Sequence, residues 1–155
     1  MSTHIRVRAG AIIIENDSIL LVEFKDEKGV HYNFPAGGVE PHESIVEAVK
    51  REAKEEASVD VAVGPLAFTY EYAPHLCEYR FGELHQVGMF FNCSIKEGSR
   101  PSFPKNPDPY QTAVKWVPLN ELHQVNLYPK MEQQIIDYVK QPKCAWFIEE
   151  RLLKQ

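Results

Sequence analysis

The sequence predicts an α/β domain in which a mixed β-sheet lies between helices, consistent with an α/β/α sandwich. β-Branched runs of strand length recur along the chain, and two segments with helical spacing of apolar residues interrupt them. The length of 155 residues is near the commonest size of a single domain, and a hydrophobic content of 44% is ordinary for a globular protein. Local pattern alone also allows an α+β arrangement.

The N-terminal part of the chain predicts a β-hairpin. Residues 5–14 form its first strand, and a short turn leads into the second strand at residues 19–24. Arg6 and Arg8 share one face of the first strand, where they either line a phosphate pocket or belong to a solvated face. A short strand at residues 30–34 then leads into a glycine-containing turn.

The stretch from residue 37 to residue 59 carries most of the chemical information. Ser44 and Glu47 form an S-x-x-E capping box, so a helix is expected from about Ile45 to Ala57. Helical periodicity gathers the apolar residues of this segment into one stripe, namely Ile45, Val46, Val49, Ala53 and Ala57.

Glu52, Glu55 and Glu56 lie within an arc of roughly 100° at the border of that stripe. Three like charges at this spacing repel one another, so a positive group is expected among them. Arg51 is one candidate. A hard divalent cation such as Mg²⁺, with Mn²⁺ as a substitute, is the other, because such cations prefer carboxylate oxygens. The alternative is a solvated acidic helix face.

The turn before the helix favours the metal. It contains Gly37 and Gly38, which permit a tight backbone whose carbonyl groups can point back at the carboxylates. A strand, a glycine turn and an acidic helix in this order are typical of a catalytic site.

These residues resemble the signature of the Nudix hydrolases, the MutT-like family, which is G-x5-E-x7-R-E-U-x-E-E-x-G-U. The matching positions are Gly37, Glu43, Arg51, Glu52, Ala53, Glu55, Glu56 and Val59. Ser58 departs from the pattern, because the family has a glycine there that ends the helix in the left-handed conformation. Either Ser58 adopts that conformation at a cost of roughly 1 kcal/mol, or the helix ends in another way.

The resemblance implies a sandwich fold for roughly residues 3–140 and a Mg²⁺-dependent hydrolase that cleaves a nucleoside diphosphate linked to another group. It implies that Arg51 and Glu43 orient the metal-binding carboxylates, and that Glu52 also acts as the base in some members. The implied metal ligands are Glu52, Glu55, Glu56 and the carbonyl of Ala36.

Three functions stay open at this point. The first is a pyrophosphatase for ADP-ribose or a nucleotide sugar, and Pro74, 15 residues after Val59, slightly favours it because a proline near that distance resembles the ADP-sugar branch. The second is a house-cleaning pyrophosphatase for nucleoside triphosphates. The third is a nucleotide-sensing module without turnover, against which the complete set of motif residues argues.

The general base is the least determined part of the predicted site. Asp108 lies in residues 99–112, a segment with four prolines that is predicted to be a loop and a candidate lid. The family often places an acid just before a Trp-containing strand, here the one with Trp116. Glu83, which follows Gly82, is the second candidate.

The remaining elements follow the same alternation of strand and helix. The remaining strands are predicted at residues 59–72, 84–95 and 113–118, and the second helix at residues 130–139. The strand at residues 59–72 is expected to break at Gly64-Pro65.

Residues 1–142 are expected to form the Nudix hydrolase domain, and residues 143–155 a C-terminal tail. The tail contains three large apolar residues in a row, Trp146, Phe147 and Ile148. Because such a run is costly to expose, the tail is expected to dock on the domain or on a second copy of the chain in a homodimer.

Charge and composition limit the partners. A formal charge of −5 without a basic stripe argues against nucleic-acid polymers, so a small nucleotide is the expected partner. No apolar run approaches the roughly 20 residues of a membrane span, and the N-terminus lacks the features of a signal peptide. The expected location is the cytoplasm. The three cysteines show neither CxxC nor zinc spacing.

Overall fold

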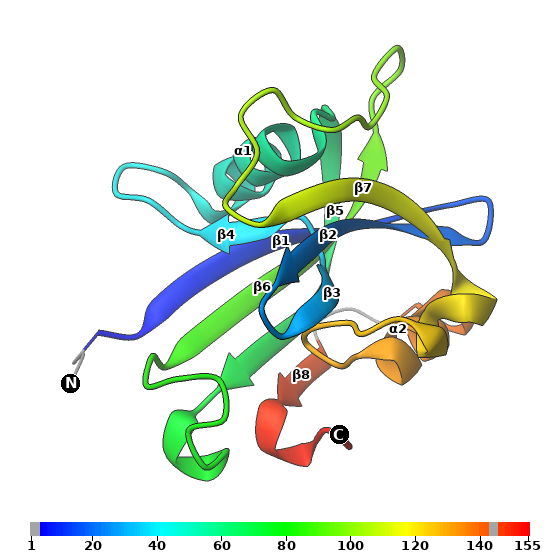
Figure 1. Cartoon of the computed structure of the whole chain (residues 1–155). Helices are drawn as coiled ribbons and strands as arrows, with labels where there is room; N and C mark the ends of the chain where they lie inside the picture. The colour runs from blue at the N-terminus through cyan, green and yellow to red at the C-terminus, as the bar shows by residue number, and fades with distance from the viewer. Residues whose placement is uncertain (1–3, 143–145) are drawn as a thin grey trace.

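A computed structural model describes residues 4–142 and 146–155 of the chain. Its elements form one mixed sheet with a helix on each side (Figure 1). In chain order they are β1 (Arg6–Glu15), β2 (Ser18–Asp26), β3 (Gly29–Asn33), β4 (Ala36–Gly38), α1 (Ile45–Ala57), β5 (Val61–Tyr72), η1 (Pro74–Leu76), β6 (Gln86–Ile95), β7 (Gln111–Pro118), η2 (Leu119–Gln124), α2 (Glu132–Lys140), β8 (Trp146–Glu149) and η3 (Glu150–Leu152).

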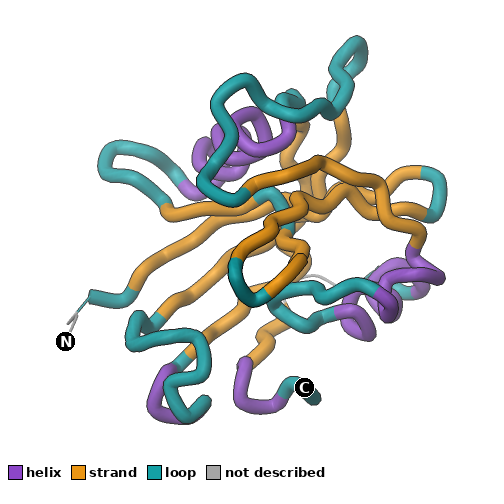
Figure 2. Tube along the Cα trace, viewed as in Figure 1, coloured by secondary structure: helices purple, strands orange, loops and turns teal. Residues whose placement is uncertain are grey.

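The sheet has the strand order β3-β2-β1-β6-β5-β8, with β4 paired to β1 and β7 paired to β2. Strand β1 runs antiparallel to β2 and β4 but parallel to β6, and β5 runs parallel to β8. The predicted mixed sheet is therefore confirmed. Figure 2 shows the strands as one continuous layer, with α1 above it and α2 below it.

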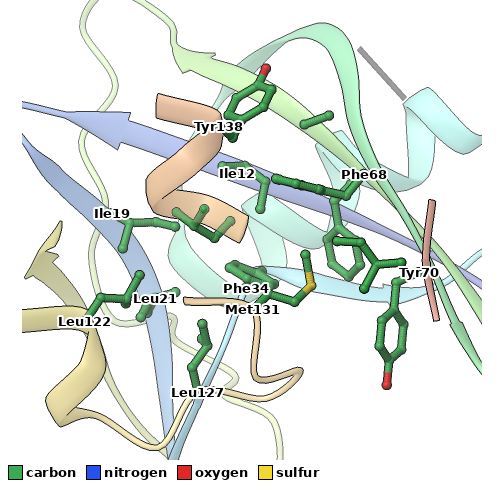
Figure 3. Close-up of a cluster of buried hydrophobic side chains, with 14 of the residues drawn as sticks. Ile12, Ile19, Leu21, Phe34, Phe68, Tyr70, Leu122, Leu127, Met131 and Tyr138 are labelled. Carbon is green, nitrogen blue, oxygen red and sulfur yellow. The ribbon is translucent and has the colours of Figure 1, made fainter. Parts of the chain in front are cut away.

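Two hydrophobic cores lie on opposite faces of the sheet because successive residues of β1 point in opposite directions. Ala9, Ala11 and Ile13 face α1, whereas Ile12 faces the core that contains α2 (Figure 3). This arrangement confirms the predicted sandwich. The α1 core is completed by Leu20, Ala48, Val49, Ala53, Ala57, Val59, Val61 and Cys93.

Helix α1 begins and ends as the sequence predicts. The Ser44 hydroxyl accepts from the Glu47 amide, and the Glu47 carboxylate accepts from the Ser44 amide at 2.7 Å, which completes the capping box. At the other end Ser58 is left-handed, with φ 53° and ψ 30°, and its amide donates to the Lys54 carbonyl. Ser58 therefore takes the conformation that the family glycine would take.

The buried face of α1 differs from the predicted stripe. Val46 is 40% exposed, so its assignment to the stripe is wrong. The face that packs on the sheet is centred closer to the acidic residues, because Glu52 and Glu56 take part in it. Its buried members are Ala48, Val49, Glu52, Ala53, Glu56 and Ala57.

The other strands lie close to their predicted positions. Strand β5 continues through Gly64-Pro65, and the expected break is instead a shift of register against β6 between Val63 and Leu66. Strand β6 begins two residues later than predicted, at Gln86. Within the described residues, no helix combines the length and the apolar character needed to cross a membrane.

The C-terminal residues add a strand to the domain. β8 pairs with β5, with the backbone of Trp146 opposite Phe68, and Ile148 is buried in the α2 core. The predicted boundary between domain and tail falls at residues 143–145, which lie outside the described residues, as does Cys144. Association with a second copy of the chain stays a prediction.

Candidate active site

Glu52 and Glu56 project from α1 towards β4. The predicted glycine turn is wrong here, because Gly37 and Gly38 lie in this strand and pair with β1. They are 7% and 3% exposed, respectively, which is unusual for carboxylates. The Ala36 amide donates to Glu56 Oε1 at 2.9 Å. Gly37 passes so close to Glu52 that a Cβ on it would lie 2.0 Å from Oε1. The motif glycine is needed here because the backbone lies directly on a carboxylate.

The electrostatics of this pair favour a positive partner. Burial raises the pKa of Glu56 to about 9, and the negative charges of Glu52 and Asp108 act in the same direction. Burial also raises the pKa of Glu52, although the hydrogen bond from Arg51 opposes this. Two buried carboxylates one helical turn apart therefore attract either a proton or a cation.

Arg51 organises the outer edge of the cluster. Its Nε and Nη2 donate to both oxygens of Glu43 at 2.6 and 3.0 Å, and Nη1 donates to Glu52 Oε1 at 2.8 Å. Nη2 also donates to the Gly38 carbonyl at 2.9 Å, which ties the helix to β4. The hydrogen bonds that Arg51 donates to Glu43 raise the pKa of Arg51, so the guanidinium stays charged. The geometry matches the orienting role that the resemblance implies.

Glu55 lies apart from the buried pair. Its side chain is 55% exposed, and its Oε2 accepts from Arg51 Nη1 at 3.1 Å. Across residues 4–142 and 146–155, no group of three or more His, Cys, Asp or Glu side chains is arranged to hold a metal ion. Glu52 and Glu56 nevertheless fit a divalent cation, because they are buried carboxylates whose mutual repulsion a cation would relieve. Glu55 joins them only by turning away from Arg51.

Two arginines of β1 lie beside the carboxylates. Arg8 Nη2 donates to the Ala36 carbonyl at 3.4 Å, and the Arg6 guanidinium lies against the backbone of Gly38. Arg8 Nε is buried and has no hydrogen-bond partner among the described residues. Burial lowers the pKa of Arg8, as does the charge of Arg6, while Glu56 opposes the shift. An unpaired buried guanidinium nitrogen is suited to an anionic ligand.

Arg6 and Arg8 also line a pocket of about 810 Å³. This volume is in the range of small-molecule sites. Glu52 and Glu56 do not line it, and Arg8 is the connection between pocket and carboxylates. The pocket combines basic and aromatic side chains with two acidic ones, among them Asp26, Lys28, His31, Arg80, Phe81, Tyr128, Lys130 and Glu150. Of the two alternatives for the arginine face of β1, the structure supports the pocket.

The two candidate bases differ in position. Asp108 is exposed, and its charge contributes to the raised pKa of Glu56. Its amide donates to Gln111 Oε1, and Gln111 Nε2 donates to the Glu56 carbonyl at 2.8 Å. The side chain of Glu83 is exposed and makes no hydrogen bond or ion pair with any residue that the structure describes. Asp108 is thus linked to α1 through its backbone and Gln111, whereas Glu83 has no such link among the described residues, and the identity of the base stays a prediction.

The proline-rich segment is attached to α1. The Ser102 amide donates to the Ala57 carbonyl at 2.9 Å, and Ser99 Oγ accepts from the Asp60 amide. The bonds from Ser102 and from Gln111 satisfy two carbonyls at the end of the helix, those of Ala57 and Glu56. Movement of the segment as a lid stays a prediction.

Sequence reasoning missed Gln111 and Glu150. Gln111 is a buried polar residue in β7, and nothing in the local pattern indicates that its side chain reaches the end of α1. Glu150 reaches the pocket through the pairing of β8 with β5, which is a long-range contact. Gln111 also lies outside the strand predicted at residues 113–118, so the sequence pattern held no signal for it.

The fold and this acid-arginine site define the class of protein as a pyrophosphohydrolase. The family model of the NUDIX domain matches residues 4–139, and the chain therefore belongs to the Nudix family. Comparison with curated proteins gave no match.

Solved structures with the same fold are similar in shape and distant in sequence. A NUDIX hydrolase from Nitrosomonas europaea has a TM-score of 0.71 and 24% identity, over 91% of this chain and 93% of that one. An ADP-ribose pyrophosphatase from Streptococcus suis has a TM-score of 0.65 and 20% identity, over 93% and 98%. A UDP-X diphosphatase has a TM-score of 0.71 and 19% identity, over 96% and 68%. Such identities show the shared fold.

Proposed function

We propose that the protein hydrolyses the diphosphate linkage of a nucleoside diphosphate that is joined to a second group. The observation that carries this proposal is the buried pair Glu52 and Glu56 beside Arg8, whose Nε lacks a partner in the described residues. Carboxylates that attract a cation and an arginine that attracts an anion are the two requirements of a diphosphate site.

Glu52 and Glu56, with the Ala36 carbonyl, are the groups that would hold a divalent cation, and Glu55 is the further carboxylate within one turn. When bound, Mg²⁺ or Mn²⁺ neutralises phosphate charge and lowers the pKa of water. Nudix hydrolases generally use such a metal.

The residues of this chain divide the remaining work. Arg8 Nε and the Arg6 guanidinium bind phosphate oxygens at the mouth of the pocket. Arg51 holds Glu52 in place through its bond at 2.8 Å and is itself fixed by Glu43. These contacts are in place before a ligand binds, so they need no reorganisation during the reaction.

ADP-ribose or a nucleotide sugar is the substrate type that we favour. The pocket of about 810 Å³ has room for a nucleoside together with a second group. Structural neighbours named as an ADP-ribose pyrophosphatase and a UDP-X diphosphatase support this choice. Nucleoside triphosphates are the alternative substrates, and they are assayed alongside.

Glu56→Gln provides the first test. Purified protein is assayed with Mg²⁺ against ADP-ribose, nucleotide sugars and nucleoside triphosphates. The variant is expected to lose about 100-fold or more in kcat, since a catalytic metal is worth several kcal/mol. Its melting temperature should stay near that of the wild type, because Ala53 and Ala57 keep the helix packed.

Glu121→Gln is the matched control, because it makes the same chemical change at an exposed glutamate of η2. Its kcat should equal that of the wild type. Hydrolysis at the normal rate in excess chelator would contradict the metal. Turnover of triphosphates alone would identify the house-cleaning activity, and nucleotide binding without any turnover would identify a sensor.

Asp108 is the general base in this proposal, supported by its charge interaction with Glu56. Asp108→Asn and Glu83→Gln are compared at saturating substrate and metal across pH. The first should lose most of kcat and change the acidic limb of the pH–rate profile, where the base becomes protonated. A wild-type profile for Asp108→Asn would exclude it and leave Glu83 or Glu52 as the base.

The cytoplasmic location and the homodimer expected from the sequence stay predictions. Gel filtration measures the oligomeric state directly.

A further inference from the structure

Glu150 is a buried carboxylate in the wall of the arginine-lined pocket. It begins η3, directly after β8, and is 3% exposed. Its Oε2 accepts from the Tyr70 hydroxyl at 3.0 Å, and its Oε1 accepts from Gln155 Nε2 at 3.3 Å. Each carboxylate oxygen can accept two hydrogen bonds, so one acceptor position remains on each.

The charge of Glu150 is only partly compensated by its surroundings. Both of its hydrogen-bond donors are neutral, and it has no ion pair within the part of the chain that the structure describes. Glu23 is different, because the Lys115 ammonium lies 2.6 Å from its carboxylate. Burial raises the pKa of Glu150, while the hydrogen bonds from Tyr70 and Gln155 and the charge of Arg80 oppose that shift. A buried carboxylate without an ion pair gains from any further donor.

The pocket is lined by cations and by carboxylate acceptors. Its basic residues are Arg6, Arg8, Lys28, Arg80 and Lys130, and its carboxylates are Asp26 and Glu150, of which Glu150 is the buried one. The charge of Glu150 raises the pKa of Tyr128 and the charge of Arg8 lowers it, in addition to the main effect of burial. Tyr128 therefore lies within the electrostatic reach of both Glu150 and Arg8.

A nucleotide has groups that complement both kinds of lining residue. Its phosphates are anionic, whereas its base and ribose carry N–H and O–H donors. Phosphates bound at Arg6 and Arg8 leave the nucleoside to occupy the rest of the pocket, where Glu150 offers acceptors. Arg6 and Arg8 suit the phosphates of such a ligand, and Glu150 suits the N–H and O–H donors of its nucleoside.

We infer that Glu150 determines substrate specificity by accepting hydrogen bonds from N–H or O–H donors of the nucleoside. This inference rests on the proposed function, because that function places the phosphates at the arginines. A site built to bond such donors rejects an analogue that lacks them, since its buried acceptor is then left unpaired. The competing explanation is a structural role, in which Glu150 only anchors Tyr70 and Gln155.

The test measures the affinity of AMP, GMP, CMP and UMP by calorimetry, because monophosphate binding needs no turnover. Glu150→Gln keeps the shape of the side chain and removes its charge. The variant is expected to bind the tightest of the four roughly 10- to 100-fold more weakly, which is the effect of a lost hydrogen bond to a charged group. Equal affinities of wild type and variant for all four, or no binding of any, would overturn the inference.

Two further variants separate recognition from folding. Glu149→Gln makes the same change at the neighbouring residue, which pairs with Arg151 and does not line this pocket, and its affinities should match the wild type. Tyr70→Phe removes a neutral donor and keeps the Glu150 carboxylate, so it should lower the melting temperature and retain nucleotide binding. Loss of binding in Tyr70→Phe equal to that in Glu150→Gln would favour the structural explanation and overturn the inference.

Analogues identify the source of the donor. Purine-riboside monophosphate lacks the amino group of AMP, inosine monophosphate lacks that of GMP, and the 2′-deoxy forms lack a ribose hydroxyl. The analogue without the recognised donor should bind the wild type more weakly and show no further loss in Glu150→Gln. Glu150-dependent binding without hydrolysis of any diphosphate would overturn the proposed function alone. Hydrolysis with binding that does not depend on Glu150 would overturn this inference alone.

Discussion

The two faces of the sheet are packed with side chains of different size. On the α1 face, five of the eleven buried residues are alanines, including Ala9, Ala11 and Ala53. On the α2 face they are large, including Phe34 and Phe68 (Figure 3). Small side chains allow the backbone of a helix to approach a sheet closely and leave it little freedom to shift. Large side chains fill a wider space and adapt more readily.

The difference in side-chain size between the two faces corresponds to the residues that each helix must position. Helix α1 must hold Glu52 against Gly37, where little space separates carboxylate and backbone. It is fixed at both ends as well, by the capping box at Ser44 and by the left-handed Ser58. Helix α2 has no side-chain cap at Met131, so its position depends on packing in the aromatic core. Helix α1 is therefore held by caps as well as by packing, whereas α2 is held by packing.

The largest effects on stability and on kcat are expected from adding the same extra side-chain volume to each core. Ala53→Leu and Ala67→Leu place the same extra atoms in the α1 core and the α2 core, respectively, and both alanines are fully buried. Both variants should lose about 1–3 kcal/mol of unfolding free energy through overpacking. Ala53→Leu should also lower kcat by about 100-fold, because a shift of roughly 1 Å in catalytic groups has that effect.

Denaturant unfolding and steady-state kinetics measure the two quantities separately. Ala67→Leu is the control, since it should retain kcat near the wild-type value at a temperature where it is folded. If both variants lost kcat equally, the α1 core would have no special role in positioning Glu52 and Glu56.

A smaller effect is expected at the end of α1. Ser58→Gly should raise unfolding free energy by about 1 kcal/mol, because glycine adopts φ 53° without the steric cost that a side chain adds. For a chain of this size the melting temperature should rise by about 2–4 °C, and kcat should be unchanged. Calorimetry checks the first and the hydrolysis assay the second. A lower melting temperature would show that the serine hydroxyl contributes more than the strain removes.

Features of α1 that depend on neighbouring residues in sequence could be predicted. The capping box at Ser44 follows from local chemistry and is confirmed, and of the two alternatives left open for Ser58 the structure has the left-handed one. The exposure of Val46 was predicted wrongly, because the rotation of a helix about its axis depends on what it packs against. Glu55 lies apart from Glu52 and Glu56 for the same reason. Spacing placed the three at one border, and the sheet buried two of them.

Long-range contacts account for what the sequence did not reveal. The strand β8 forms only because β5 offers a parallel partner, and no local signal at residues 146–149 specifies that partner. Glu150 enters the pocket as a result of that pairing. Asp108 could be proposed from its place before Trp116, yet its approach to α1 depends on Gln111. Contacts between residues that are far apart in the sequence are not indicated by local sequence patterns.

The two parallel pairings also bear on how the chain folds. Strand β1 pairs with β6, with Arg6 opposite Gln86, and β5 pairs with β8, with Phe68 opposite Trp146. Each pairing closes a long loop, and the entropy of that closure must be overcome before the contact gains anything. Non-local pairing of this kind slows folding. Because β1 carries Arg6 and Arg8 and β8 leads to Glu150, the wall of the pocket is complete only when both pairings have formed.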